Sequence, residues 1–103
     1  MLRSTLEEED GSAILTLVGE LSFETVHEAR EALQSLVRTT APSLTLDIGG
    51  IDRFDLAGVQ LIFSLRHTLT DRALTVELGS LAPRMNKLFA FAGLPRDGLF
   101  QGA

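Results

Sequence analysis

The chain has no cysteine, no tryptophan and no tyrosine among its 103 residues. Without cysteine it forms no disulfide and offers no thiolate as a nucleophile or a metal ligand. Phenylalanine is its one aromatic residue type for stacking single-stranded nucleic acid. The nine basic residues are scattered and the formal net charge is −5, so the sequence lacks the basic patch that a phosphate backbone requires. These absences argue against disulfide-rich, thiol-dependent and nucleic-acid-binding classes of protein.

Long hydrophobic runs are also missing. No apolar run approaches the roughly 18 residues of a membrane span, so no direct membrane insertion is expected. The opening MLRSTLEEED is acidic and lacks the apolar core of a signal peptide. Hydrophobic residues make up 45% of the chain and charged residues 22%, a balance typical of globular proteins. We expect residues 1–103 to form one cytoplasmic domain with one core.

Hydrophobic patterning predicts strands that alternate with helices. The first two strands, Leu2–Glu8 and Ala13–Val18, flank Asp10-Gly11, which is typical of hairpin turns. A helix with a capping box of Thr25 and Glu28 is expected next, and it ends before Pro42. A strand over Leu44–Ile48 and a helix from Asp55 or Leu56 to about Thr70 follow. The last expected elements are a strand over Ala73–Leu78 and a helix from Pro83 that stops at Gly93. The order favours an α/β sheet with right-handed crossovers.

Three aspartates near strand ends are the first candidates for chemistry. Asp47, Asp52 and Asp55 could together hold Mg²⁺, as the aspartates of a phosphate-receiver domain do. Such a domain also needs an acidic pair after its first parallel strand, where this chain has only Glu20. It needs a lysine at a late strand end, whereas Lys87 falls inside the last expected helix. Surface and capping carboxylates are therefore the favoured interpretation.

The remaining polar residues do not form a catalytic set. Neither His27 nor His67 has a potential metal ligand at a suitable spacing, and exposed helix positions suit both better. Neither Ser22 nor Ser64 belongs to a nucleophile motif with a histidine or lysine partner. The segment GGIDRFDLAG matches no phosphate-binding loop. We therefore predict a non-enzymatic protein without metal or cofactor.

The segment IDRFDLAGVQLIF, Ile51 to Phe63, places one carboxylate among apolar residues at the start of a helix. Asp55 suits the N-cap, because a carboxylate there accepts a backbone N–H and favours the positive helix end. Apolar residues surround it on several sides of the first turns. One hypothesis is a deeply buried helix start. The other is an exposed apolar rim for protein docking, at the carboxyl ends of strands where α/β folds place their sites.

Several stretches resemble the STAS domain family, the family of the bacterial anti-sigma factor antagonists. They are LTLVGELSFETVHEAREAL, SLTLDIGGIDRFDLAGVQLI and LTVELGSLAPRMNKLFAFAGL, which match the family's motifs in order and spacing from about Ala13 to Leu94. The resemblance implies an α/β STAS-like sandwich, with a small mixed, mostly parallel sheet and helices packed on it. It also implies a protein without catalysis or cofactor.

The resemblance bears most directly on the segment around Asp55. In the family, a kinase-type anti-sigma factor phosphorylates the second serine of a D-S-S-G motif, and the unphosphorylated form binds that kinase. Asp55 and Gly58 match the motif, and Val59 stands for the leucine that follows it. Leu56 replaces the first serine and Ala57 replaces the phosphoacceptor. Because alanine has no hydroxyl, the usual phosphorylation switch is not expected at this position.

The resemblance implies a partner-binding site and a kind of partner. The expected site comprises Phe54, Asp55, Leu56, Ala57, Gly58, Val59 and Ser22, the last standing where the family's opening motif usually has an aspartate. The expected partner is an anti-sigma factor or serine-kinase-like protein. The alternative is an accessory STAS subunit of an ABC-type lipid transporter. A nucleotide sensor is a weaker third class, because no phosphate-cradling glycines or lysine cluster support it.

Overall fold

The computed structural model describes residues 1–69, 71–81, 83–84 and 87. Its elements, in chain order, are β1 (Leu2–Glu9), β2 (Ser12–Leu21), the 3-10 turn η1 (Phe23–Thr25), α1 (Val26–Arg38), β3 (Ser43–Phe54), α2 (Leu56–Thr68), β4 (Ala73–Glu77) and the 3-10 turn η2 (Gly79–Leu81). In these residues no helix is long and apolar enough to span a membrane.

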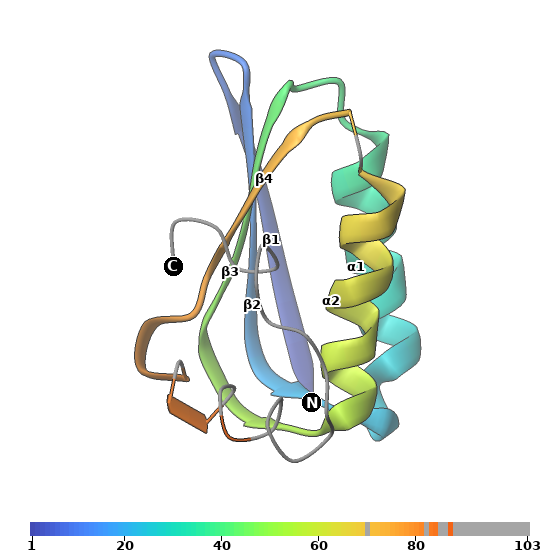
Figure 1. Cartoon of the computed structure of the whole chain (residues 1–103), viewed down its shortest axis with the longest axis vertical. Coiled ribbons are helices and arrows are strands. Elements are labelled where there is room, and N and C mark those ends of the chain that lie inside the picture. Colours follow the sequence, from blue (N-terminus) through green and yellow to red (C-terminus); the bar gives the residue numbers. More distant parts are fainter. Residues whose placement is uncertain (70, 82, 85–86, 88–103) are drawn as a thin grey trace.

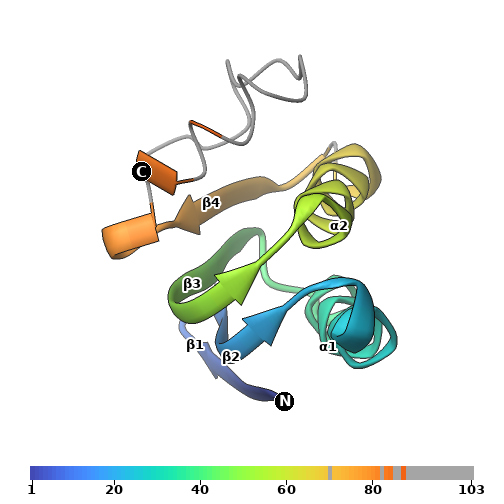
Figure 2. The same ribbon diagram turned by 90° about the horizontal axis from the view of Figure 1, so that it is seen from below.

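The four strands form one mixed sheet in the order β1-β2-β3-β4. β1 runs antiparallel to β2, whereas β2, β3 and β4 are mutually parallel. Both helices pack on the same face of the sheet, side by side (Figures 1 and 2). The predicted fold class, a small and mostly parallel mixed sheet with helices packed on it, is therefore confirmed.

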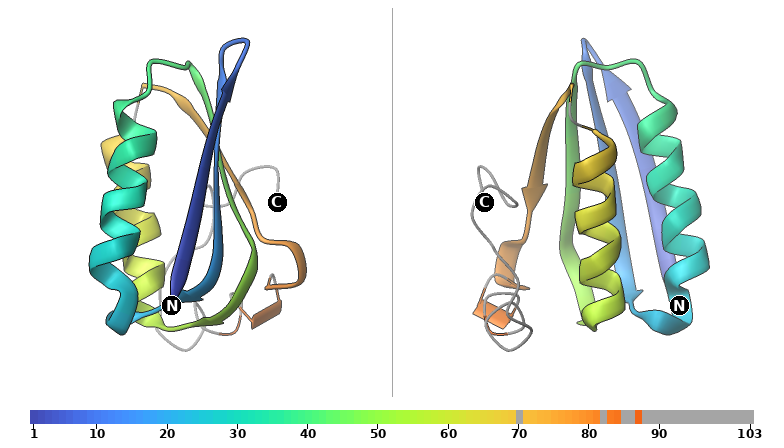
Figure 3. Two further views of the ribbon diagram at one scale, coloured as in Figure 1. Left: turned by 180° about the vertical axis from the view of Figure 1, so that it is seen from behind. Right: turned by 45° about the vertical axis from the view of Figure 1, so that its right-hand side comes forward.

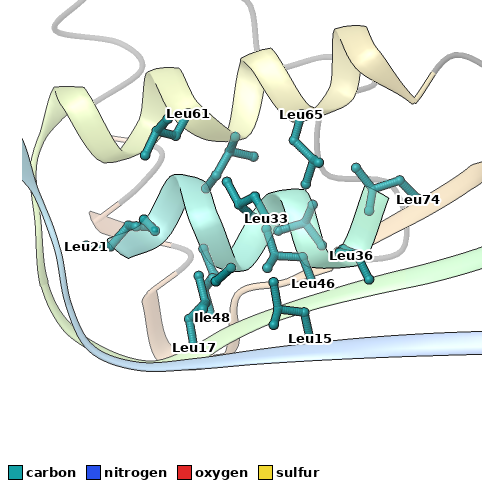
Figure 4. Packing of buried hydrophobic residues seen from close by; sticks show 14 of the residues in the cluster. Leu15, Leu17, Leu21, Leu33, Leu36, Leu46, Ile48, Leu61, Leu65 and Leu74 are labelled. Carbon is teal, nitrogen blue, oxygen red and sulfur yellow. The ribbon is translucent and has the colours of Figure 1, made fainter. Parts of the chain in front are cut away.

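The core lies between the two helices and the sheet. Alternate strand residues point toward the helices, so the registered residues Leu15, Leu46 and Val76 are all at most 1% exposed. Figure 4 shows Leu33 and Leu36 of α1 and Leu61 and Leu65 of α2 opposite Leu15, Leu17 and Leu46 of the sheet. Burial of this cluster removes a large apolar area from water and stabilises the layered arrangement.

The first hairpin has the predicted turn. Asp10 and Gly11 form a two-residue loop between the paired residues Glu9 and Ser12, and both have positive φ, 44° and 81°. Aspartate and glycine tolerate this conformation, which suits the twist of an antiparallel hairpin.

The central strands are longer than predicted. β2 continues past Val18 to Leu21, and β3 continues past Ile48 and through Gly49-Gly50 to Phe54. The two strands pair through this region despite two register shifts, which arise because β3 has one extra residue opposite the β2 steps from Thr16 to Val18 and from Gly19 to Glu20. A Cβ on Gly50 would lie 3.2 Å from Cγ2 of Val18, so glycine allows the strands to approach closely. Tertiary pairing thus extends strands through residues that favour a loop.

The predicted capping box of Thr25 and Glu28 is wrong. The Thr25 side chain makes no cap at the start of α1. It instead accepts a hydrogen bond from the backbone N–H of Ser22 at 3.0 Å, while the Ser22 hydroxyl accepts one from the Glu24 N–H at 3.2 Å. The capping interaction therefore belongs to η1, one turn earlier in the chain.

Two predicted helix ends fall near the limits of the described residues. α2 ends at Thr68, close to the predicted end near Thr70. The last predicted helix, from Pro83 to its stop at Gly93, lies outside the described residues except for Pro83, Arg84 and Lys87.

Candidate functional site

Two loops leave the sheet at the same end. Leu21, the last residue of β2, pairs with Phe54, the last residue of β3. The Asp55 N–H then donates a hydrogen bond to the Leu21 carbonyl at 3.3 Å. As a result η1 and the start of α2 lie next to each other, and both helices begin at this end of the sheet (Figure 3).

Asp55 joins the two loops with its carboxylate. Its Oδ1 accepts a hydrogen bond from the Gly58 N–H at 3.2 Å, which confirms the predicted N-cap of α2. Its Oδ2 accepts a second hydrogen bond, at 3.1 Å, from the N–H of Phe23 in the other loop. One side chain thus fixes the start of the helix and the position of η1 together.

Gly58 allows α2 to pack directly on the end of β2. A Cβ at this position would lie 2.5 Å from the carbonyl oxygen of Leu21 and 2.9 Å from its Cγ. Real side chains do not tolerate so close an approach, so any larger residue would push the helix away from the strand. Gly58 is buried and supports the site without contacting solvent.

Ser22 is turned inward. It is 5% exposed, and its hydroxyl donates to a Glu20 carboxylate oxygen while accepting from the Glu24 N–H. The Thr25 hydroxyl lies 2.9 Å from the Glu20 carbonyl oxygen and completes the network. Ser22 therefore stabilises the loop beside Asp55 and does not present its hydroxyl at the surface.

The apolar run around Asp55 divides between core and surface. Val59 is 1% exposed and belongs to the core, as the first hypothesis expected. Leu56 is 38% exposed, as the rim hypothesis expected, whereas Ala57 is half-buried. Phe54 is half-buried, and the Arg84 guanidinium lies 4.9 Å from the centre of its ring.

Phe23 is the residue that the sequence interpretation missed. Its side chain is 74% exposed, although phenylalanine is usually buried. It follows Ser22 directly and fits neither the strand alternation before it nor the helical stripe after it, and that mismatch was the available signal. Phe23 lies on one side of the hydrogen-bonded Asp55 and Leu56 and Ala57 on the other; we call these three residues the docking surface, after the role proposed for them below.

Other sequence candidates lie apart from this surface or have local roles. Asp47 Oδ1 accepts a hydrogen bond from the Gly49 N–H at 2.9 Å, within its own strand. His27 pairs with Glu31 at 2.8 Å on the outside of α1, where their side chains are 82% and 67% exposed. His67 is exposed on α2. Within residues 1–69, 71–81, 83–84 and 87, no three histidine or acidic side chains gather closely enough to hold a metal ion.

A four-stranded mixed sheet with both helices on one face is the fold of the SpoIIAA-like proteins. An anti-sigma factor antagonist from Mycobacterium paratuberculosis superimposes with a TM-score of 0.73, at 17% identity over 92% of this chain and 84% of that one. The unphosphorylated anti-sigma factor antagonist SpoIIAA gives 0.63, at 20% identity over 93% and 89%. The phosphorylated Bacillus SpoIIAA gives 0.62, at 23% identity over 89% and 85%.

The sequence itself identifies the family. A family model described as "Mlab, STAS domain" matches residues 4–101, so the chain belongs to the STAS domain family. No curated protein matches the chain in sequence.

Proposed function

We propose that this protein is a non-enzymatic, cytoplasmic protein-binding module of the anti-sigma factor antagonist type, acting in bacterial signalling or transcription regulation. Its partner is an anti-sigma factor or serine-kinase-like protein. The observation that carries the proposal is the exposure of Phe23 and Leu56 on either side of a hydrogen-bonded Asp55. Likeness to anti-sigma factor antagonists supports it.

The docking surface has the properties of a binding hot spot. Burying a phenylalanine or leucine side chain against a partner contributes roughly 1.5–3 kcal/mol relative to leaving it exposed. Aromatic anchors are common among residues that dominate binding energy. The Asp55 hydrogen bonds fix both backbones before binding, so little conformational entropy is lost on association.

Binding at this surface would not be switched by phosphorylation of residue 57. A phosphate there would add about −1.5 to −2 charges beside Asp55 and repel an apolar partner. Ala57 carries no hydroxyl to accept it. The neighbouring Ser22 is buried, and its hydroxyl is hydrogen-bonded on both sides. The surface would therefore be permanently competent to bind.

A docking surface that binds without a phosphorylation switch also suits a second function. An accessory STAS subunit that braces an ABC-type lipid transporter would need stable docking and no phosphorylation switch. Ala57 is the residue that favours this alternative. The partner would then be a transporter subunit reached from the cytoplasm.

Affinity capture with a matched pair of variants tests the proposal. Tagged wild type, Leu56→Glu and Leu6→Glu would be exposed to a bacterial lysate that includes detergent-solubilised membranes. Leu6 on β1 is the control, because it is 37% exposed, against 38% for Leu56, and lies on a different element. We expect Leu56→Glu to lose the partner and Leu6→Glu to retain it, with thermal stability nearly unchanged in both.

The captured protein decides between the two functions. A kinase-like anti-sigma factor that Leu56→Glu loses would support the antagonist proposal, whereas transporter subunits would support the accessory role. Equal capture of the partner by wild type and both variants would show that the docking surface does not bind it. A large drop in the melting temperature of Leu56→Glu alone would instead assign Leu56 to the core.

A further inference from the structure

A second surface feature lies between the two helices, away from the docking surface. α1 and α2 run side by side on the sheet (Figure 3), and a groove of about 370 Å³ follows the line between them. Its floor is apolar and consists of Leu33 and Val37 from α1 and Leu61 and Leu65 from α2. Leu33, Leu61 and Leu65 retain 4–8% exposure, and Val37 is half-buried.

The walls of the groove are polar and basic. Arg30 and Arg38 stand on the α1 side and Ser64 and Thr68 on the α2 side, and all four are exposed. None of the nine lining residues is acidic. The chain as a whole has 14 acidic and nine basic residues, so the groove opposes the overall charge.

The two arginines are available for an external partner. The ion pair on the outer side of α1 joins His27 to Glu31 and does not include them. Within the described part of the chain neither Arg30 nor Arg38 forms an ion pair. Their eight-residue separation corresponds to about 12 Å along the helix axis.

We propose that this groove docks an amphipathic helix of a partner protein, with leucine-like side chains on the apolar floor and acidic residues against Arg30 and Arg38. A helix in a groove presents apolar residues at i, i+3 or i+4, and i+7. Acidic residues seven or eight positions apart on such a helix would match the spacing of the two arginines. The proposal does not depend on the docking surface, which lies at the start of α2.

The test is a titration of the whole ¹⁵N-labelled chain with two synthetic peptides, followed by amide chemical shifts. The first is a stapled helix of about 14 residues with leucines at i, i+3 and i+7 and glutamates along the flank. The second is identical except for lysines in place of the glutamates. We expect the acidic peptide to shift the amides of Arg30–Arg38 and Leu61–Thr68, with a Kd below about 1 mM, and the basic peptide to bind about tenfold more weakly or worse.

Variants separate charge recognition from apolar adhesion. The double variant Arg30→Glu, Arg38→Glu should reverse the preference for the two peptides. The milder Arg30→Gln, Arg38→Gln should weaken the acidic peptide several-fold if the glutamate variant does not fold. Arg53→Glu, at an exposed arginine of β3 outside the groove, is the control and should leave binding unchanged.

Three results would overturn the proposal. They are the absence of groove shifts at about 1 mM acidic peptide, equal affinity for the two peptides, and shifts confined to the docking surface. A fourth contradicting result could come from sedimentation of the chain without peptide. A concentration-dependent dimer that is lost in Arg30→Gln, Arg38→Gln would assign the groove to a second copy of this chain.

Discussion

At the scale of single residues, Asp55 explains an acidic residue in an apolar run. Its carboxylate points toward two backbone N–H groups, those of Gly58 and of Phe23, which lies 32 residues earlier in the chain. Its neighbour Leu56 keeps 38% of its surface exposed. The aspartate is therefore structural, and the residues that it positions are the apolar ones.

Replacing Asp55 with alanine should lower the free energy of unfolding by about 1–2 kcal/mol, because both N–H groups lose their acceptor. Asp55→Asn should fall between wild type and alanine, since an amide has one acceptor oxygen for two donors. Urea denaturation measures both changes. Stability equal to wild type in Asp55→Ala would show that the two bonds contribute nothing net.

At the scale of elements, Arg72 holds the end of α1. It lies in the connection between α2 and β4, and its guanidinium donates to the carbonyls of Thr39 at 2.6 Å, Val37 at 2.7 Å and Ala41 at 3.3 Å. The last carbonyls of a helix have no partner within the helix, and a cation there also favours the negative helix end. Arg72 thus joins the connection after α2 to the connection after α1.

Arg72→Met should cost about 2 kcal/mol of stability, because the side chain keeps its apolar stem but leaves these carbonyls without their charged donor. Arg72→Lys is the control. It keeps the charge but not the planar fork, and should recover only part of the loss. Thermal denaturation of both variants measures the difference, and a methionine variant as stable as wild type would show that solvent replaces the guanidinium.

At the scale of the whole molecule, the central strands of the sheet and its edge strand β1 differ in burial. β2 and β3 lie inside the sheet and carry most of its fully buried residues, whereas every residue of β1 after Leu2 is exposed. β1 still pairs with β2 along its whole length. Its acidic residues Glu7, Glu8 and Glu9 disfavour pairing with another edge strand.

Amide hydrogen exchange should therefore be slowest in β2 and β3 and faster in β1. The central strands open only with the core, whereas an edge strand can separate locally. Exchange followed by NMR would give the opening free energy at each amide. Equal protection of β1 and β3 would show that the hairpin and the core open as one unit.

The sequence predicted the elements better than their ends. Alternation and helical spacing located both described helices and the four strands, because burial on one face imposes those periods. The extension of β3 through Gly49-Gly50 was missed, since its hydrogen bonds come from β2, a partner that local propensity does not represent. The misplaced capping box has a local origin, because the Ser22 hydroxyl bonds to Glu20 and to the Glu24 N–H, each two residues away, and so caps the turn before α1.

The candidate site was only partly predictable. The N-cap role of Asp55 follows from local helix chemistry and was predicted. The exposure of Phe23 and the burial of Val59 depend on how η1 and α2 pack at the end of the sheet. The sequence shows that a residue is apolar but not whether its side chain faces the core or solvent. The exposed Phe23 and the buried Val59 could therefore not be distinguished from sequence.

Local chemistry accounts for the alternation of strands and helices, the hairpin turn at Asp10-Gly11, the cap at Asp55 and the missing hydroxyl at Ala57, because each depends on a residue's own chemistry or on its near neighbours. Tertiary structure alone decided that Asp55 also binds the Phe23 loop, that Leu56 faces solvent while Val59 is buried, and that two arginines flank an apolar groove. These features depend on segments far apart in the chain, and only the pairing of β2 with β3 and the packing of α1 beside α2 bring those segments together.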